Sequence, residues 1–300
     1  MCSKLVDRFR EVGFVYLSHR PRRQHRTEDV EKLWEHIVAT VEAGRRLSDH
    51  VENIARLLKK IANSARLSCQ EEKVAQFIVD FTLFHHDAGK GDINYQLYAH
   101  RVVKKILMPH NFASIAFLNK SNIYTEFLEE LEDLSVDVGL ADRLFSVCLT
   151  AILVHHEYYD YKDLSSLNII ATSTILKSKK LEEAKAVFHS DSFYAELQRA
   201  AEKVGFYVIP NRLREIMVID AVEACSDIVV QHYMFGAEKL LSSWKRYISV
   251  DRYEALTASL SSALTWLITL ADNIASRRRG GEAGRYAELI SKYYAWGGSR

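Results

Sequence analysis

The amino-acid sequence predicts an all-α fold, and three observations support this prediction. Hydrophobic residues recur with the spacing of amphipathic helices along most of the 300 residues. Only three prolines interrupt the chain, namely Pro21, Pro109 and Pro210. Residues 71–86 and 140–156 are hydrophobic on nearly every side, which is typical of helices in the middle of a bundle. With 48% hydrophobic residues, a chain of this length can bury a sizeable core.

The N-terminal region is strongly basic. Residues 1–27 contain seven Lys and Arg residues against Asp7 and Glu11, which gives +5 in a chain whose formal net charge is +1. We expect residues 1–27 to be a basic extension, with a minor β element at residues 12–18, ahead of a single domain over residues 28–300. The basic residues of this extension could contact DNA or a partner protein, or could simply be solvated.

Two amphipathic helices are expected at the start of the domain. Over residues 28–44, the apolar positions from Val30 to Val41 follow the i, i+3, i+4, i+7 spacing of a buried helical stripe. Residues 48–62 repeat this spacing, and Ser48 is a suitable N-cap. Each of these helices should therefore present one apolar face to the core.

The second half of the chain also has helical patterns, which cover residues 181–204, 211–243 and 252–278. Residues 158–180 look irregular, and we expect an insertion into the domain around residues 158–210. The chain contains no internal repeat and no low-complexity linker, so nothing in the sequence divides it into two domains.

The charge and the cysteine pattern argue against several classes of protein. A net charge of +1 gives no global field that would attract nucleic acid or membrane. The four cysteines form no C-x-x-C pair, so neither a zinc knuckle nor a disulfide framework is indicated, and reduced thiols fit best. The N-terminus lacks the apolar stretch of a signal peptide, and the longest apolar runs are too short to span a bilayer. We therefore expect a cytoplasmic protein without a membrane partner.

Histidines and aspartates gather at the ends of the predicted core helices or on their apolar faces. They are His50, His86, Asp87, His110, His155, His156 and Asp272. His50 lies four residues before Ile54, which places it on the apolar face of its helix. Each residue alone could be a satisfied core residue, but burying all of them without partners would cost several kcal/mol. A metal centre removes that cost, because neutral imidazole and carboxylate are metal ligands.

The stretch LFHHDAGKGD, residues 83–92, contains two of these residues, His86 and Asp87. Together with the order of the other histidines and aspartates along the chain, it resembles the HD phosphohydrolase superfamily. HHDAGKGDINYQ, followed by PHNFASIAFL, VHHE and ADNIASRRRG, is similar to the HD nuclease of CRISPR type I interference. The resemblance spans roughly residues 45–280 and implies an HD-domain helical bundle with a dinuclear metal site. In that family the nuclease is often fused to a superfamily 2 helicase. The stretch AGKGD is no Walker A loop, and this chain contains no such helicase. The resemblance therefore implies a stand-alone nuclease subunit that acts on single-stranded DNA, with a separate superfamily 2 helicase and a guide-RNA surveillance complex.

The same resemblance implies a role for each residue. One metal would be held by His50, His86, Asp87 and Asp272. Asp87 would bridge to a second metal, held also by His110, His155 and His156. Lys90 would face the scissile phosphate, so that Asp87 and Lys90 are the catalytic residues. The interval from His156 to Asp272 looks long for the family, and Asp220 and Asp227 are alternatives for the last ligand.

The residue types in this pattern suit phosphodiester hydrolysis by two metals about 4 Å apart. Imidazole and carboxylate together favour Mn, Fe, Ni or Co, although Mg could also bind. The arginines at residues 277–279, which are Arg277, Arg278 and Arg279, could hold backbone phosphates, or could simply favour a helix C-terminus. Tyr95 and Tyr98 could stack on single-stranded bases, or could simply pack.

Three functions share this pattern. The first is a metal-dependent nuclease that degrades single-stranded DNA in CRISPR interference. The second is an HD phosphohydrolase that acts on nucleotides or small phosphate esters, and the ligands alone do not separate it from the first. The third is a non-catalytic HD-fold scaffold, which the complete set of ligands disfavours.

Overall fold

The computed structural model describes residues 15–20, 30–65, 69–101, 110–121, 123–155, 190–209 and 252–279. These stretches are mostly helical and contain no strand, so the prediction of an all-α fold is confirmed for them. The expected helix over residues 211–243 and the irregular region over residues 158–180 lie outside the described residues.

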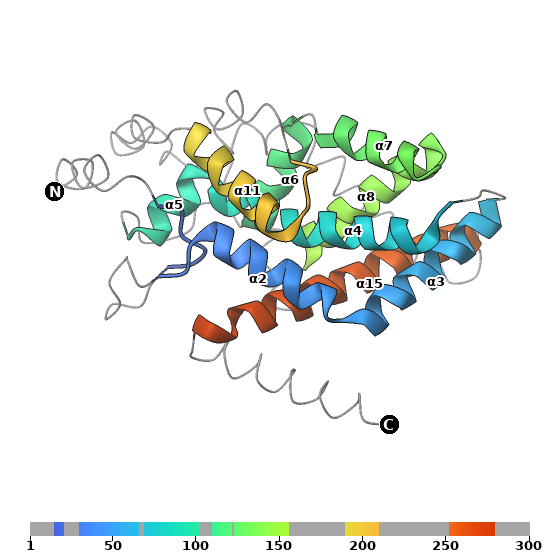
Figure 1. Cartoon of the computed structure of the whole chain (residues 1–300), viewed down its shortest axis with the longest axis horizontal. Helices are drawn as coiled ribbons and strands as arrows, with labels where there is room; N and C mark the ends of the chain where they lie inside the picture. Colours follow the sequence, from blue (N-terminus) through green and yellow to red (C-terminus); the bar gives the residue numbers. More distant parts are fainter. Residues whose placement is uncertain are drawn as a thin grey trace, which may run out of the picture.

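Five long helices form the centre of the molecule. The helices α2 (Leu33–Arg45), α3 (Ser48–Ala65) and α8 (Val138–Val154) pack against α15 (Arg252–Ala275) (Figure 1). The helix α4 (Glu71–His85) packs in turn against α2, α3 and α8. The last of the described long helices, α15, therefore lies beside helices from the first half of the chain, which brings residues more than 200 positions apart into contact.

Other elements surround this centre. After α4 come the 3₁₀ helix η2 (Ala88–Gly91) and the helix α5 (Ile93–Ala99). The helix α6 (His110–Lys120) packs on η2, and α7 (Ile123–Asp133) packs on α8. The helix α11 (Ser190–Val204) packs on α2. The helices α5 and α6 both pack on η2, and they thereby hold the turn that follows α4 in place.

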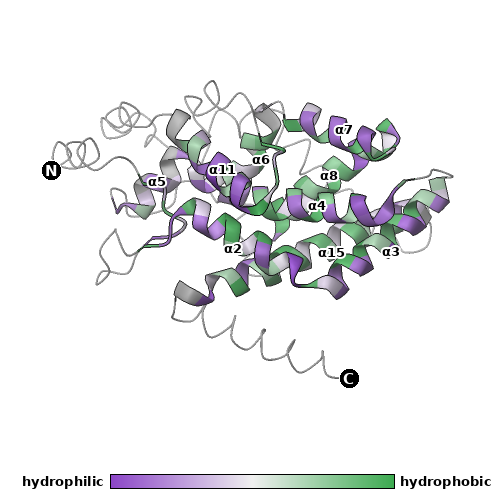
Figure 2. Ribbon diagram, in the orientation of Figure 1, coloured by the Kyte–Doolittle hydropathy of each residue, from purple (hydrophilic) through white to green (hydrophobic). Residues whose placement is uncertain are grey.

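The helices α4 and α8 are buried on nearly every side, as their sequences predict. All of the residues from Ile78 to His85 are buried, and so are those from Val147 to Leu153. Figure 2 shows α8 as hydrophobic over most of its length. The apolar pattern therefore identified the two helices that the rest of the bundle surrounds.

The first helix of the domain begins later than its apolar pattern suggested, at Leu33. The residues before it are extended, because Leu17 and Lys32 form an isolated antiparallel bridge. The backbone N–H of Leu33 donates to the carbonyl of Tyr16 at 2.8 Å. The carboxylate of Glu35 accepts a hydrogen bond from the Lys32 N–H at 3.0 Å and so closes the first turn.

The minor β element expected at residues 12–18 is therefore reduced to this single bridge in its described part, which begins at residue 15. Tyr16, Leu17 and Ser18 are fully buried, and Tyr16 belongs to the main hydrophobic core. The described part of the basic extension thus packs into the helical domain.

The helix α15 is longer than any continuous apolar run in the sequence, and those runs were judged too short to span a bilayer. By length and composition alone, Tyr253–Ala275 could cross a bilayer, and half of its most hydrophobic window is buried inside the structure. A core helix meets the same criterion, and α15 has the packing of one, against α2, α3 and α8.

Candidate metal centre

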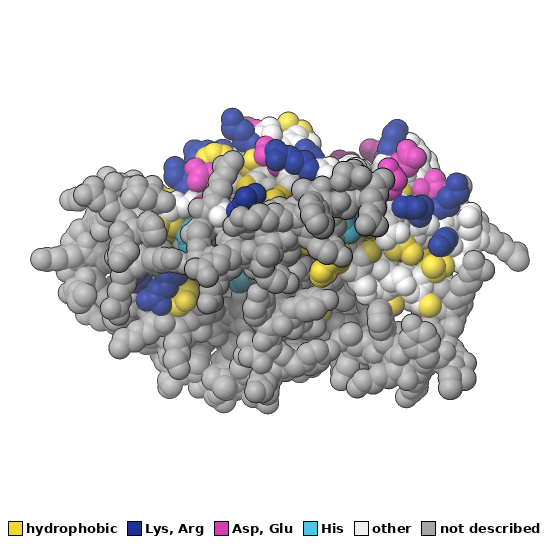
Figure 3. Space-filling view, turned by 90° about the horizontal axis from the view of Figure 1, so that it is seen from below, with side chains coloured by type: hydrophobic (Ala, Val, Ile, Leu, Met, Phe, Trp, Pro, Cys, Tyr) yellow, Lys and Arg dark blue, Asp and Glu magenta, His cyan; other side chains and the backbone are white. Residues whose placement is uncertain are grey.

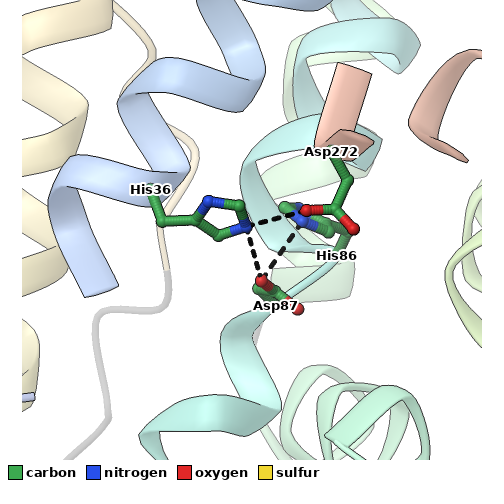
Figure 4. A group of neighbouring side chains, drawn as sticks. All are labelled: His36, His86, Asp87 and Asp272. Atoms are coloured by element: carbon green, nitrogen blue, oxygen red, sulfur yellow. Dashed lines mark ion pairs between the residues drawn. The ribbon is translucent and has the colours of Figure 1, made fainter. Parts of the chain in front are cut away.

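Three helices bring four titratable side chains to one point. His36 is the fourth residue of α2, and Asp272 lies near the end of α15. His86 and Asp87 directly follow the last residue of α4. One nitrogen or oxygen of each side chain lies within 4.8 Å of those of the other three. Figure 4 shows the four side chains pointing toward one another.

The shortest distances in this first group involve His36 and Asp87. The Nε2 atom of His36 lies 3.0 Å from Asp87 Oδ2 and 3.0 Å from Asp272 Oδ1. The Nε2 atom of His86 lies 3.3 Å from the same Oδ2 of Asp87. The first group therefore offers two imidazole nitrogens and two carboxylates to one point.

A second group shares Asp87 and adds His110 and His155. His110 is the first residue of α6, and His155 follows the last residue of α8. The Nε2 atom of His110 lies 3.1 Å from Asp87 Oδ1, while the ring centre of His155 lies 6.0 Å from that of His110. Since Oδ2 of Asp87 faces the first group and Oδ1 faces the second, this carboxylate has the position of a bridging ligand.

Two of the histidines are oriented by their own helices. The Nδ1–H of His86 donates to the Leu83 carbonyl at 2.7 Å, and that of His155 donates to the Ile152 carbonyl at 2.6 Å. Both acceptors lie in the last turn of a helix, where carbonyls have no partner within the helix. With Nδ1 used in this way, Nε2 of each ring is the nitrogen left for the cluster.

The turn after α4 is held tightly against α6. The hydroxyl of Ser114 donates to the His86 carbonyl at 2.9 Å and accepts from the Gly89 N–H at 2.8 Å. A Cβ atom at Gly89 would come within 2.1 Å of the His110 carbonyl oxygen, so this close approach requires glycine. The glycine after the His-Asp pair therefore brings His110 to the cluster.

Both aspartates are held as carboxylates. Burial alone would raise the pKa of Asp87, but the charges of His86 and Lys90 outweigh it and hold the pKa well below its usual range. Burial would likewise raise the pKa of Asp272, but the hydrogen bond and charge of His36 hold it well below the usual value. Metal ligands need this charge state.

The histidines of the second group are held neutral. Burial lowers the pKa of His155 to about 3, and the nearby imidazoles of His86 and His110 add to this shift. Burial and the charge of Lys90 lower the pKa of His110, although Asp87 opposes this shift. Neutral imidazoles beside ionised carboxylates are the protonation states in which both residue types bind metal.

The donor atoms fit a metal ion. The Nε2 atom of His86 is buried and makes no hydrogen bond within the described part of the chain, and such a group costs about 1–3 kcal/mol. Mixed nitrogen and oxygen donors suit Mn, Fe, Co or Ni better than Mg, which prefers an all-oxygen shell. The two buried groups could therefore hold metal ions.

The position expected for His50 is occupied by His36, which the sequence analysis missed. His50 is the third residue of α3, which starts at Ser48 itself, and it is half-buried and belongs to neither group. His36 lies three residues after Leu33 on the buried face of α2. That spacing is a signal for His36, although a stripe defined by apolar residues alone does not include it.

For other predicted site residues, the structure does not describe the residue or does not describe its side chain. His156, Asp220 and Asp227 are not among the described residues. Arg277 is exposed, at the second residue of the 3₁₀ helix η5 (Ser276–Arg279), whose last two arginines have side chains that are not described. The structure thus places Asp272, the preferred last ligand, in the first group, while its two alternatives are not described.

Comparison with protein-family models, with curated proteins and with solved structures found no match to this chain. The likeness to HD nucleases therefore stays a prediction, and the geometry of the two groups is the main support for a function.

Proposed function

We propose that the protein is a metal-dependent phosphodiesterase that degrades single-stranded DNA. Asp87 supports this most directly, because its two carboxylate oxygens face two different groups of histidines. The chemistry that two divalent transition-metal ions supply, when bound to such a pair of groups, is an activated water and neutralisation of charge on the phosphate. Asp87 would be shared by both ions, and the remaining residues of each group would complete its ligand set.

Lys90 places a positive charge beside both groups. Its Nζ atom lies 2.5 Å from Asp87 Oδ2, and only 4% of the residue is exposed. A buried charge is weakly screened, so it attracts an anionic phosphate more strongly than a surface lysine would. We assign Lys90 to binding the scissile phosphate and Asp87 to the ligand shell.

A run of aromatic and cationic side chains leads away from Lys90. Its Nζ atom lies 6.0 Å from the ring centre of Tyr95, which in turn lies 6.5 Å from that of Tyr98. The guanidinium of Arg20 lies 4.6 Å above the Tyr98 ring. Tyr98 and Arg20 are partly exposed. Since Tyr95 is buried, Tyr98 is the ring of this pair on which a base could stack, with the Arg20 cation beside it. This arrangement supports a single strand as the substrate.

Arg277 offers a further phosphate contact. It is exposed and lies five residues after Asp272, at the end of the helix that carries this ligand. Arg278 and Arg279 would extend the same contact along the backbone of the strand, with little readout of sequence.

A second candidate is a phosphohydrolase for nucleotides or small phosphate esters. On the described part of the face in Figure 3, positive and negative side chains are interspersed, and no broad basic surface stands out. A small ester needs only the two groups and Lys90, without an extended basic track. The metal ligands are the same in both cases.

The partners of the proposed nuclease follow from the family resemblance alone. A separate superfamily 2 helicase would expose the single strand, within a guide-RNA surveillance complex in the cytoplasm. A non-catalytic scaffold with the same fold would need none of the charge arrangement around Asp87.

One assay separates these functions. The protein is stripped of metal and supplied with Mn, Co, Ni or Mg together with single-stranded DNA, duplex DNA, RNA and a panel of nucleotides. We expect cleavage of single strands that is lost in Asp87→Ala and kept in Asp142→Ala, a change of an exposed aspartate on α8. Turnover of nucleotides without cleavage of DNA would support the phosphohydrolase, and no turnover of any substrate would support the scaffold.

A further inference from the structure

Residues 16–18 are hydrogen-bonded to two segments that lead to residues of the candidate metal centre. On one side, the side-chain amide of Gln96 accepts from the Leu17 N–H and donates to the Leu17 carbonyl, both at 3.0 Å. The same amide donates to the carbonyl of Lys90 at 2.6 Å. On the other side, the Ser18 N–H donates to the Glu31 carbonyl at 3.1 Å. The segment is thus joined both to the turn that carries Lys90 and to the start of α2.

The side chain of Glu31 lies between this segment and a ligand of the first group. The buried hydroxyl of Ser18 donates to Glu31 Oε2 at 2.7 Å. The same Oε2 lies 3.5 Å from Nδ1 of His36. The opposite nitrogen of that ring, Nε2, is the atom that faces Asp87 and Asp272. A chain of contacts therefore runs from the Ser18 hydroxyl through the Glu31 carboxylate to the His36 imidazole, which faces the metal centre.

His36 differs from His86 and His155 in where it lies on its helix. Those two histidines follow the ends of α4 and α8, and a carbonyl three residues earlier is open to their Nδ1. His36 lies inside α2, where the carbonyls nearby are committed to helical hydrogen bonds. An acceptor for its Nδ1 must come from another part of the chain, and Glu31 is at the required place.

We propose that Glu31 is a positioning residue for His36, held in place by Ser18. The inference rests on the proposed metal centre. A carboxylate at Nδ1 keeps the proton on that nitrogen, leaves the lone pair of Nε2 for the metal, and makes the imidazole a more basic ligand. Residues 16–18, which belong to the predicted basic extension, thereby support the metal centre through Ser18.

The test compares two glutamates at the start of α2. Glu31→Ala removes the carboxylate at His36, whereas Glu35→Ala removes only the cap of the first helical turn. Metal-free full-length protein is titrated with Mn²⁺ by calorimetry, and thermal unfolding in chelator reports on the fold. We expect Glu31→Ala to weaken Mn²⁺ binding about 10–100-fold. Glu35→Ala should lower the melting temperature and leave Mn²⁺ affinity unchanged.

A double-mutant cycle with His36 separates positioning from general destabilisation. If Glu31 acts through His36, Glu31→Ala should cause no further loss of Mn²⁺ affinity in a His36→Ala background. Ser18→Ala should weaken binding less than Glu31→Ala, because the carboxylate remains. If Glu31→Ala does not fold, the matched pair Glu31→Gln and Glu35→Gln decides, and only the first should bind Mn²⁺ several-fold more weakly.

If the wild-type chain binds Mn²⁺, three results would overturn the inference. They are wild-type Mn²⁺ affinity in a folded Glu31→Ala or Glu31→Gln protein, an equal loss in the corresponding Glu35 variant, and an undiminished loss in the His36→Ala background. A wild-type chain that binds no Mn²⁺ would also overturn it, together with the metal centre. A wild-type chain that binds Mn²⁺ but cleaves no DNA would contradict the proposed nuclease and leave the role of Glu31 intact.

Discussion

The helix α4 joins two regions that are stabilised in different ways. Around Phe81, aromatic rings meet closely, with ring centres 4.7 Å apart for Phe81 and Phe127 and 5.2 Å apart for Phe127 and Phe145. Directly after the end of the same helix, His86 and Asp87 face other titratable groups. A stretch of a few residues thus passes from a hydrocarbon core to a cluster of acids and imidazoles.

The two regions respond to burial in opposite ways. Aromatic rings gain free energy on leaving water, and pairs in edge contact contribute about 0.5–1.5 kcal/mol beyond this. Buried carboxylates and imidazoles lose hydration, which must be offset by opposite charges, hydrogen bonds or a metal. The aromatic region should therefore stabilise the fold to the same extent with and without metal, while the titratable region should stabilise it more when metal is bound.

The largest effect is expected for Asp87→Asn, because this carboxylate belongs to both groups. Cleavage of single-stranded DNA should fall about a thousandfold or more, which corresponds to several kcal/mol of lost charge stabilisation. Metal at a hundred times its dissociation constant should stabilise the wild-type protein by about 2.7 kcal/mol and the variant hardly at all. Thermal unfolding with and without Mn²⁺ measures this, and a variant that Mn²⁺ stabilises like wild type would contradict the shared role of Asp87.

In the aromatic region, Phe81→Ala should lower the free energy of unfolding by about 3–5 kcal/mol in the presence of chelator, because it leaves a cavity in the core. Denaturant unfolding measures this loss. At a temperature where the variant is still folded, its Mn²⁺ affinity should equal that of wild type. Phe81→Leu, which leaves a smaller cavity, should cost less. A fall in Mn²⁺ affinity similar to that of Asp87→Asn would show that the two regions are not separate.

His85 marks the boundary between the two regions. Its ring packs 4.7 Å from Phe81 and 5.0 Å from Phe84, and its Nε2–H donates to the Val208 carbonyl at 3.0 Å. Its Nδ1 is buried without a hydrogen bond within the described part of the chain. Burial lowers the pKa of His85 to about 4. Although it neighbours the His-Asp pair, His85 therefore belongs to the hydrophobic core.

The pH dependence of stability tests this boundary. The unfolded chain takes up a proton at His85 near pH 6.5, but the folded protein does so only near pH 4. As the pH falls through this range, the metal-free protein should lose up to about 1.4 kcal/mol per pH unit from His85. His85→Gln, whose amide can still donate to the Val208 carbonyl, should make the slope shallower. Equal slopes for the two proteins in denaturant titrations would contradict a neutral core role for His85.

The sequence was sufficient to predict the long helices of the bundle. Their apolar spacing depends only on which faces are buried, so it identified α2, α3, α4, α8 and α15 without knowledge of their neighbours. The helices α5 and α7 were not predicted. With 7 residues, α5 depends on tertiary packing more than on its own pattern. In α7 the buried residues Ile123, Phe127 and Leu131 recur every four positions, so its pattern was a signal that the prediction missed. The late start of α2 likewise depends on a distant partner, since Leu17 pairs with Lys32.

The candidate metal centre was only partly predictable, for a related reason. His86 and Asp87 stand together in a recognisable motif, and Asp272 lies in an apolar helix with a similar context. His36 has no such context, and only its place on the buried face of α2 links it to the site. His50 satisfied the same test of helical spacing, because spacing gives a direction around a helix axis but not the neighbour found there.

The smallest effect is expected at the start of α8, the helix whose other end leads to His155. Asp137 is its N-cap and accepts a hydrogen bond from the Gly139 N–H at 2.9 Å. Asp137→Ala should cost about 1 kcal/mol, and Asp137→Asn, which keeps an acceptor, should cost less. For a chain of this size, 1 kcal/mol corresponds to a melting temperature lower by about 2–4 °C.

Metal binding should not change in Asp137→Ala, because other contacts hold the far end of α8. The Asn111 side chain donates to the Leu153 carbonyl at 2.5 Å, and the Thr269 hydroxyl donates to the His155 carbonyl at 3.1 Å. The helix has 17 residues, so its cap lies about 25 Å from this end. Calorimetric titration with Mn²⁺ measures the affinity. A weaker affinity in Asp137→Ala, but not in Asp137→Asn, would mean that fraying at one end of α8 reaches His155, and that the fold and the metal centre are coupled along this helix.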